Sequence, residues 1–251
     1  MEDTLTVKNG SRIAYEKTPG KAPGVMFLGG FHSDMTGKKV TALEAHCRAV
    51  GRAFVRFDYT GHGASSGLFE EGVVSAWAQD AIAVLDEVTK GPQVLVGSSM
   101  GGWVMLLATL ARPARVCGLV GVAAAPDFTE DLIWDKLSTE ARHEIETVGK
   151  WIHPSDSGED SYPITQALIE DGRRHLLLRG PVAIGCPVRL IHGMQDESVP
   201  WEVSKKLMAV ITSEDTTLTL VKGGDHRLSE ASDIVRLTEV IDALCLENEY
   251  G

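Results

Sequence analysis

Short, continuous apolar runs that stop at a glycine recur along this chain and alternate with segments of helical spacing. Residues 25–28 stop at Gly29, and residues 94–96 stop at Gly97. A strand that is apolar on both faces belongs inside a covered sheet, because only there are both faces buried. Strands that alternate with helices form right-handed strand–helix–strand units. The pattern therefore predicts an α/β fold with a mostly parallel sheet and helices on both faces.

The same patterns extend over most of the chain and predict eight strands. The first two alternate apolar and polar side chains, which indicates an antiparallel hairpin ahead of the parallel part. Helical spacing fills several of the gaps, as in residues 40–50, 77–88, 104–112 and 234–244. The expected strands are residues 4–7, 12–18, 25–28, 53–57, 93–96, 116–122, 188–191 and 217–221.

One long stretch breaks this alternation. From about residue 127 to residue 185 the pattern is mostly helical, and the stretch carries Phe128, Trp134 and Trp151. Ligands bind at the carboxyl ends of the strands in sheets of this kind, so a long insertion between two strands is expected to cover that edge. We therefore predict one domain over residues 1–251 with a helical lid at about residues 127–185. The alternative is an insertion that covers nothing functional.

Composition excludes several classes of protein. The chain has 24 Lys and Arg against 35 Asp and Glu, a formal net charge of −11, so it lacks the basic excess of a nucleic-acid binder. No run approaches the ~18 apolar residues of a membrane span. No signal-peptide pattern precedes the first strand, which predicts a cytoplasmic protein, or a mitochondrial matrix protein only as a processed form. Neither zinc-ligand spacings nor nucleotide-binding motifs occur, so no metal and no cofactor is predicted.

Two segments fit G-x-S-x-G, the pattern of a nucleophile elbow, in which a serine stands on a sharp turn between a strand and a helix. They are residues 97–101 (GSSMG) and residues 63–67 (GASSG). The first directly follows an apolar strand and directly precedes an apolar helix. The second lies in a loop well after its strand ends, and no apolar helix begins there. This context predicts Ser99, rather than Ser65, as a nucleophile.

A serine hydroxyl is a weak nucleophile unless a base accepts its proton and an acid orients that base. Asp196 follows the next-to-last predicted strand, and His226 follows the last one. Because the carboxyl ends of parallel strands share one edge, we expect Ser99, Asp196 and His226 to converge there. The order serine, acid, histidine is that of α/β hydrolases. Asp127, which follows the preceding strand, is an alternative acid.

Acyl transfer also needs two backbone N–H groups aimed at the developing oxyanion. We predict that Met100, the residue after the nucleophile, supplies one and that Phe31, in the loop after the third strand, supplies the other. His32 is expected close enough to contact substrate. Trp134 and Trp151 are candidates for an apolar acyl pocket under the lid, although side chains of this kind equally well attach a lid to the core.

These motifs together resemble the α/β-hydrolase-fold serine hydrolases over nearly the whole chain. More narrowly, the chain resembles the mitochondrial α/β-hydrolase-domain depalmitoylases, which are also described as acyl-glucuronide esterases. The resemblance implies cofactor-free hydrolysis of acyl thioesters or activated oxygen esters by a triad of Ser99, Asp196 and His226. The matching segments are residues 56–59 (RFDY), 97–103 (GSSMGGW), 192–196 (HGMQD), 199–201 (VPW) and 225–227 (DHR).

The expected partner is therefore a small-molecule or protein-linked acyl ester or thioester, with no nucleic acid and no stable membrane insertion. The same triad serves other reactions, so a general carboxylesterase, a C–C bond hydrolase and a cofactor-free peroxidase stay as alternatives. A non-catalytic scaffold that binds a ligand or a partner is a further alternative, against which the intact triad argues. The sequence does not indicate which oligomeric state the protein adopts.

Overall fold

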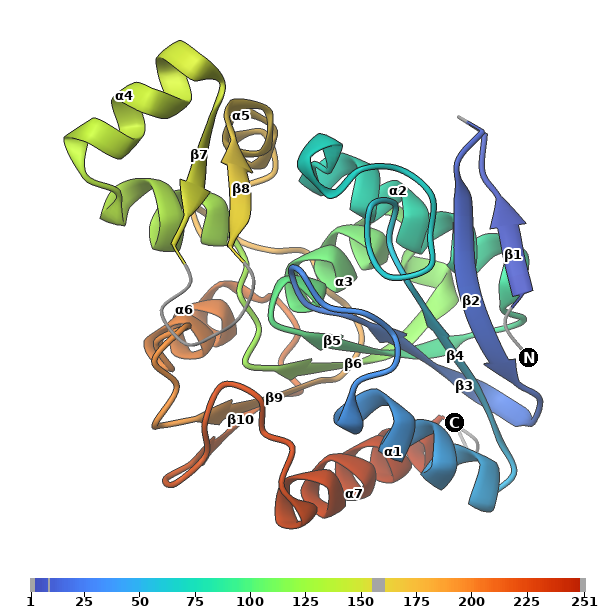
Figure 1. Ribbon diagram of the computed structural model, residues 1–251. Helices are drawn as coiled ribbons and strands as arrows, with labels where there is room; N and C mark the ends of the chain where they lie inside the picture. Colours follow the sequence, from blue (N-terminus) through green and yellow to red (C-terminus); the bar gives the residue numbers. More distant parts are fainter. Residues whose placement is uncertain (1–2, 9, 155–160, 249–251) are drawn as a thin grey trace.

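The computed structural model describes residues 3–8, 10–154 and 161–248. In these residues eight strands form one sheet in the order β1-β2-β4-β3-β5-β6-β9-β10 (Figure 1). The six strands from β4 to β10 in that order run parallel, and β1 and β2 pair antiparallel at one edge, as predicted. The strands are β1 (Asp3–Thr6), β2 (Arg12–Thr18), β3 (Lys21–Leu28), β4 (Arg52–Phe57), β5 (Gln93–Ser98), β6 (Val116–Val122), β9 (Val188–Gly193) and β10 (Thr216–Val221).

The continuous apolar runs are explained by two hydrophobic cores, one on each face of the sheet. In β5, Leu95 belongs to one core, whereas Val94 and Val96 belong to the other, and all three are fully buried. Successive side chains of a strand point to opposite faces, so a strand covered on both sides is apolar throughout. In the described ranges no helix is long and apolar enough to span a bilayer.

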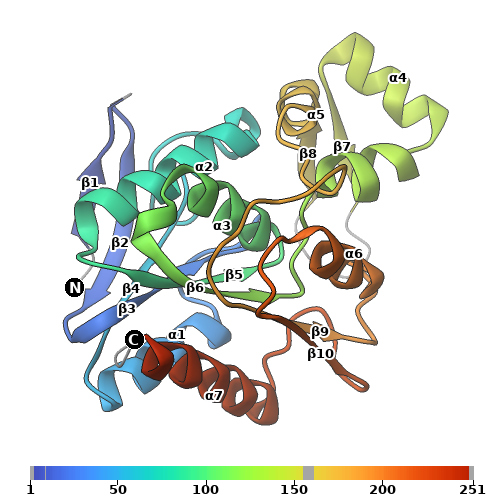
Figure 2. The same cartoon turned by 180° about the vertical axis from the view of Figure 1, so that it is seen from behind.

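Helices cover both faces, as Figures 1 and 2 show. One face carries α1 and α7, which pack against each other, and the opposite face carries α2, α3 and α6. The spacing of apolar residues 40, 43 and 47 predicted the buried side of α1, where Val40, Leu43 and Cys47 are buried. The helices are α1 (Lys38–Ala49), α2 (Val74–Ala83), α3 (Met100–Ala111), α6 (Glu202–Val210) and α7 (Ala231–Glu247).

Residues 127–185, called the insertion below, connect β6 to β9. They lie at one end of the sheet, beyond α3 and away from α1 and α7 (Figures 1 and 2). The insertion is mainly helical, but it also holds an antiparallel strand pair that the sequence pattern did not predict. Its elements are the single turns η4 (Thr129–Ile133) and η5 (Trp134–Lys136), then α4 (Thr139–Val148), β7 (Lys150–His153), β8 (Tyr162–Thr165) and α5 (Gln166–Arg173).

Two buried carboxylates hold the insertion: one joins its two ends to each other, and the other attaches it to α2. Asp127 accepts backbone hydrogen bonds from Leu177 (2.7 Å) and Leu178 (2.8 Å), which ties the start of the insertion to its return. Asp171 on α5 accepts hydrogen bonds from the backbone N–H (2.7 Å) and the hydroxyl (2.9 Å) of Ser75 on α2. Asp127, the alternative acid, is thus engaged in holding the chain and has no contact with His226.

Candidate active site

Ser99 stands on a sharp turn between β5 and α3. Its backbone has φ 55° and ψ −122°, a strained conformation for a residue with a side chain. The glycines on either side leave no room for a methyl group. A Cβ on Gly97 would lie 2.5 Å from the carbonyl oxygen of Gly101, and one on Gly101 would lie 2.1 Å from that of Leu28. Close contact with neighbouring backbone therefore excludes any residue but glycine at these two positions. The turn presents Ser99 at the sheet edge.

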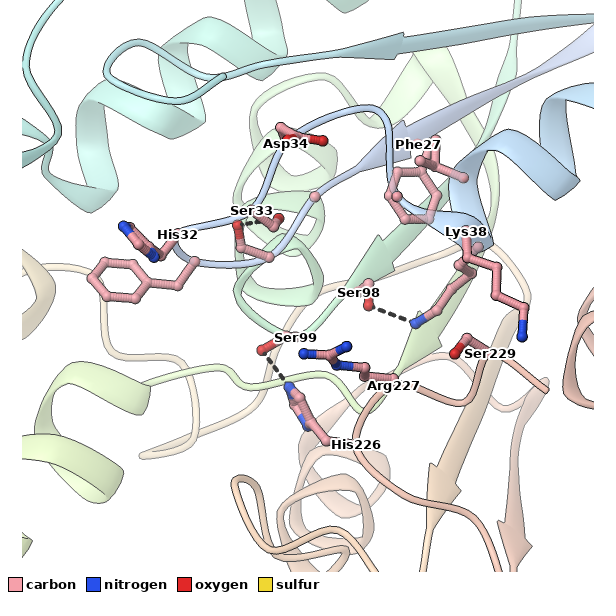
Figure 3. A pocket seen from close by; sticks show the side chains of 16 residues that line it. Phe27, His32, Ser33, Asp34, Lys38, Ser98, Ser99, His226, Arg227 and Ser229 are labelled. Atoms are coloured by element: carbon pink, nitrogen blue, oxygen red, sulfur yellow. Dashed lines mark hydrogen bonds between the residues drawn. The ribbon is translucent and has the colours of Figure 1, made fainter. Parts of the chain in front are cut away.

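The structure brings the three predicted residues together. His226 Nε2 lies 3.2 Å from Ser99 Oγ (Figure 3), and His226 Nδ1 lies 2.7 Å from Asp196 Oδ2. Asp196 follows β9 and His226 follows β10, which are parallel neighbours in the sheet. The carboxylate is fully buried, whereas the histidine is 29% exposed, so the chain of hydrogen bonds runs from the interior to an accessible hydroxyl.

Asp196 is surrounded by hydrogen-bond donors. Its Oδ1 accepts from the backbone N–H groups of Ser198 (2.9 Å) and Val199 (2.8 Å), and its Oδ2 faces His226 and His192 (3.1 Å). Burial on its own raises the pKa of Asp196, but the hydrogen bonds from His192, His226 and Val199 together hold that pKa well below its usual range. These hydrogen bonds therefore favour the ionised, carboxylate form of the acid.

The loop after β3 lies directly beside the nucleophile. A Cβ on Gly30 would be 3.4 Å from the Cβ of Ser99. Among the described residues, no acceptor takes the backbone N–H of Phe31 or of Met100. Neither predicted oxyanion donor is therefore used by another group of the described chain.

A second loop, which follows β4, holds the loop after β3 in place. Asp58 accepts the backbone N–H of Met35 (2.7 Å), and His62 Nε2 accepts that of His32 (3.3 Å). Burial lowers the pKa of His62 to about 4, so its ring is neutral and can accept. His32 itself has φ 55°, a conformation that needs such support.

Ser65, the serine of the other G-x-S-x-G match, belongs to this supporting loop. Its hydroxyl donates to the carbonyl of Asp58 (2.7 Å) and accepts the backbone N–H of Ala14 on β2 (2.8 Å). Both hydrogen-bonding directions of the hydroxyl are used within the fold, so Ser65 fastens a loop to the sheet. The structure does not bring it to His226.

A cavity of about 690 Å³ opens at Ser99 and His226. In Figure 3, Ser99 and His226 face each other, with His32 to one side and Lys38 and Arg227 to the other. His32 thus lies where the sequence analysis expected it. The cationic side was not predicted: it places positive charge beside the reacting groups of a protein whose net charge is −11.

Lys39 is a buried part of the same cavity wall. Its Nζ donates to the hydroxyl of Ser98 at 2.9 Å. Burial lowers the pKa of Lys39 to about 8, although the nearby charges of Asp225, Asp233 and Asp196 act in the opposite direction. The sequence did contain a signal, because Lys39 stands four residues before the buried Leu43 and hence on the apolar side of α1.

Trp134 and Trp151 do not line this cavity. Arg173 and Arg142 lie over the ring of Trp134, at 4.7 and 5.4 Å from its centroid, and the ring of Trp151 lies 5.3 Å from that of His153. Both tryptophans pack against the main core from within the insertion.

Phe31 lines the cavity and joins the loop after β3 to a group of aromatic side chains. Two of these belong to the insertion, so the apolar wall beside the nucleophile continues into it. The ring centroids nearest to Phe31 are those of Phe69 (4.9 Å), Phe128 (5.4 Å), Tyr162 (5.4 Å) and Trp77 (5.9 Å).

Several known proteins are similar to this chain in sequence and in structure. The chain is 44% identical over 233 residues to the mouse protein named palmitoyl-protein thioesterase ABHD10, mitochondrial. The aligned region covers 92% of this chain and 78% of the mouse protein. The human protein of the same name is 42% identical over 233 residues, or 92% of this chain and 76% of the human protein.

Solved structures agree with these sequence matches. The alpha/beta hydrolase domain-containing protein 10 from mouse superposes with a TM-score of 0.91 at 40% identity and 100% coverage of both chains. A putative hydrolase from Agrobacterium vitis S4 superposes with a TM-score of 0.93 at 38% identity and 98% coverage of both. The model of the alpha/beta hydrolase family matches residues 25–237. This chain belongs to the alpha/beta hydrolase family.

Proposed function

We propose that this protein is a serine hydrolase that cleaves acyl thioesters or carboxylic esters, with Ser99 as nucleophile, His226 as base and Asp196 as the acid that orients it. The observation that carries the proposal is the chain of hydrogen bonds from Ser99 through His226 to Asp196, at 3.2 and 2.7 Å, beside an open cavity. Such a chain gives a serine hydroxyl the nucleophilicity that it lacks on its own. Membership of the alpha/beta hydrolase family supports the same reaction class.

The proposed reaction has two halves. Ser99 Oγ attacks the acyl carbonyl while His226 takes its proton, and the N–H groups of Phe31 and Met100 stabilise the oxyanion. The intermediate collapses to an acyl-enzyme, and His226 protonates the departing thiolate or alkoxide. Water then attacks the acyl-enzyme with His226 again as base, which releases the acid and regenerates Ser99.

For the substrate, we propose a long-chain acyl thioester, either small or attached to a protein. The mouse and human relatives are named as palmitoyl-protein thioesterases, and the aromatic wall around Phe31 offers an apolar surface beside the nucleophile. We also propose that residues 127–185 act as a lid within a single domain. Cytoplasmic localisation stays a prediction, because the mouse and human relatives are named as mitochondrial proteins. Fractionation of cells that make the protein would test the predicted localisation.

The test is a matched set of acyl thioesters and oxygen esters, with acyl chains from about two to sixteen carbons, assayed for kcat/KM. Ser99→Ala is the control, and we expect it to lower kcat by about 10⁴-fold or more while the fold is kept. Preference for long thioesters, abolished in the control, is the expected result.

Preference for short or aromatic oxygen esters would instead make the protein a general carboxylesterase with the same triad. Hydrolysis that persists in Ser99→Ala would remove Ser99 from the mechanism. If no substrate turned over in a Ser99-dependent way, the proposed esterase and thioesterase activity would fail, and a C–C bond hydrolase or a non-catalytic scaffold would take its place.

A further inference from the structure

A second histidine contacts the acid of the triad. His192, near the end of β9, is completely buried, and its Nε2 lies 3.1 Å from Asp196 Oδ2, the oxygen that also faces His226. The same Nε2 lies 3.0 Å from the carbonyl oxygen of Val199. A carboxylate and a carbonyl can only accept, so Nε2 of His192 carries a hydrogen and donates.

The other nitrogen of His192 is also engaged. Its Nδ1 lies 2.6 Å from the hydroxyl of Ser204, a fully buried residue of α6. With the hydrogen on Nε2, Nδ1 of a neutral ring accepts the hydrogen of that hydroxyl. Contacts on both sides therefore fix the tautomer and the orientation of the ring. Hydrogen bonds run continuously from Ser204 through His192, Asp196 and His226 to Ser99.

The carboxylate of Asp196 consequently has four donors, two histidine rings on one oxygen and two backbone amides on the other. A carboxylate has about four acceptor sites, so its capacity is filled. The other charged groups around this part of the site are Lys39, whose pKa responds to the Asp196 charge, and Glu197, Asp225 and Arg227, which neighbour the acid and the base in the chain. A change at His192 leaves all of these in place.

We propose that His192 is a positioning residue, which holds Asp196 from the interior and sets how strongly that carboxylate stabilises positive charge on His226. This inference rests on the proposed function, because it concerns the same triad. A carboxylate that shares its negative charge with a second donor attracts the proton of an imidazolium less strongly. His192 thereby limits how strongly Asp196 attracts the proton on Nδ1 of His226 and keeps the carboxylate turned toward that nitrogen.

The test compares His192→Asn with His192→Gln. The Asn amide replaces Nδ1 and reaches Ser204 but not Asp196, whereas the longer Gln amide places an N–H donor near the position of Nε2. We expect His192→Asn to move the acid limb of the kcat/KM profile upward by about one pH unit. We also expect kcat to fall about ten-fold with little change in KM, because the acid is less well oriented. His192→Gln should restore both the limb and most of kcat.

A second readout does not depend on turnover. The proton shared by His226 and Asp196 should give a far-downfield ¹H NMR resonance, and we expect this resonance to shift in His192→Asn and to return toward its original position in His192→Gln. Acid limbs and resonances unchanged in both variants, or changed equally in both, would overturn the inference. A failure of the proposed function would appear differently, as a wild-type protein without Ser99-dependent turnover. The resonance comparison would still decide the role of His192 in that case.

Discussion

The carboxyl edge of the sheet and the insertion at residues 127–185 are held in place by different kinds of contact. At the edge, the backbone around Gly97 and Gly101 is packed so closely that a methyl group does not fit, and buried Asp196 has all its acceptor sites filled. In the insertion, charged pairs at the surface are prominent. Examples are Arg173 with Glu130 (2.7 Å) and Lys150 with Glu70 (2.6 Å).

This difference separates what must be rigid from what can vary. Exposed ion pairs contribute only about 0–1 kcal/mol each, so the position of the insertion depends mainly on its buried contacts. These are the hydrogen bonds between Asp171 and Ser75 and the apolar side chains that the insertion packs into the core. The edge is fixed by close backbone contacts at Gly97 and Gly101 and by the buried hydrogen bonds of Asp196. Attack by a serine requires atoms held to within a fraction of an ångström, whereas contact with an acyl chain does not. The geometry for chemistry therefore lies in the tightly packed region.

The largest expected difference between the two regions is in how much stability and activity are lost when one glycine in each region is replaced by alanine. In Gly101→Ala the new Cβ would lie 2.1 Å from the Leu28 carbonyl oxygen and 2.6 Å from that of Gly29, so backbone must move. We expect a loss of about 3 kcal/mol or more in unfolding free energy, and of about 100-fold in kcat/KM. Urea unfolding and ester hydrolysis measure the two effects.

Gly180→Ala in the insertion is the matched control. Nothing lies within 4 Å of a Cβ there, so both stability and activity should stay close to those of the wild type. A Gly180 variant as damaged as the Gly101 variant would show that the two regions are equally constrained, and the comparison would be wrong.

The parallel core of the fold was predictable because its signal is local. A strand buried on both faces must be apolar at every position, as residues 94–96 are, and a parallel sheet must reverse through helices. The elbow was predictable for the same reason: the two G-x-S-x-G matches differ in the strand before them and the helix after them. Strand ends also predicted that Asp196 and His226 would approach Ser99. In the structure His226 lies at hydrogen-bonding distance from Ser99, and Asp196 lies at hydrogen-bonding distance from His226.

What could not be predicted depends on neighbours distant in the sequence. Lys39 lines the cavity beside Ser98, 59 residues away, and Ser65 is fastened to Ala14, 51 residues away. The strands β7 (KWIH) and β8 (YPIT) have four residues each, too few for apolar and polar side chains to show a recognisable alternation in the sequence. Trp134 was a candidate either for an acyl pocket or for attaching the lid to the core; it packs against the core, and two guanidinium groups lie over its ring.

Substitution of Lys39 should have an effect of intermediate size, which raises stability and lowers activity. We expect Lys39→Met to raise the unfolding free energy at pH 7 by on the order of 2 kcal/mol, because methionine fills the buried position without a charge. Activity should fall, since a cation is removed from the cavity wall. Such a trade is typical of functional positions. Thermal unfolding and kcat/KM on the same preparations measure both changes.

The pH dependence of this stabilisation has a definite sign. Burial lowers the pKa of Lys39 to about 8 from 10.5, so between these values the unfolded chain binds more protons than the folded one, and wild-type stability rises with pH. The penalty is fully present below pH 8. The advantage of Lys39→Met should therefore shrink as pH rises above 8. An advantage that is constant with pH would mean that packing, rather than charge, sets the difference.

The smallest expected effect concerns the choice of acyl chain, and it compares Trp134 with Phe31. Phe31 lines the cavity and Trp134 does not. Phe31→Leu keeps the backbone N–H while it reshapes the apolar wall, so we expect it to change the ratio of kcat/KM between long and short thioesters by about ten-fold. Trp134→Ala should change that ratio by less than about three-fold, because what it removes is the stacking of Arg173 and Arg142. A change with Trp134→Ala as large as that with Phe31→Leu would mean that the insertion contacts the acyl chain directly. In that case substrate selection would extend from the tightly packed edge into the insertion.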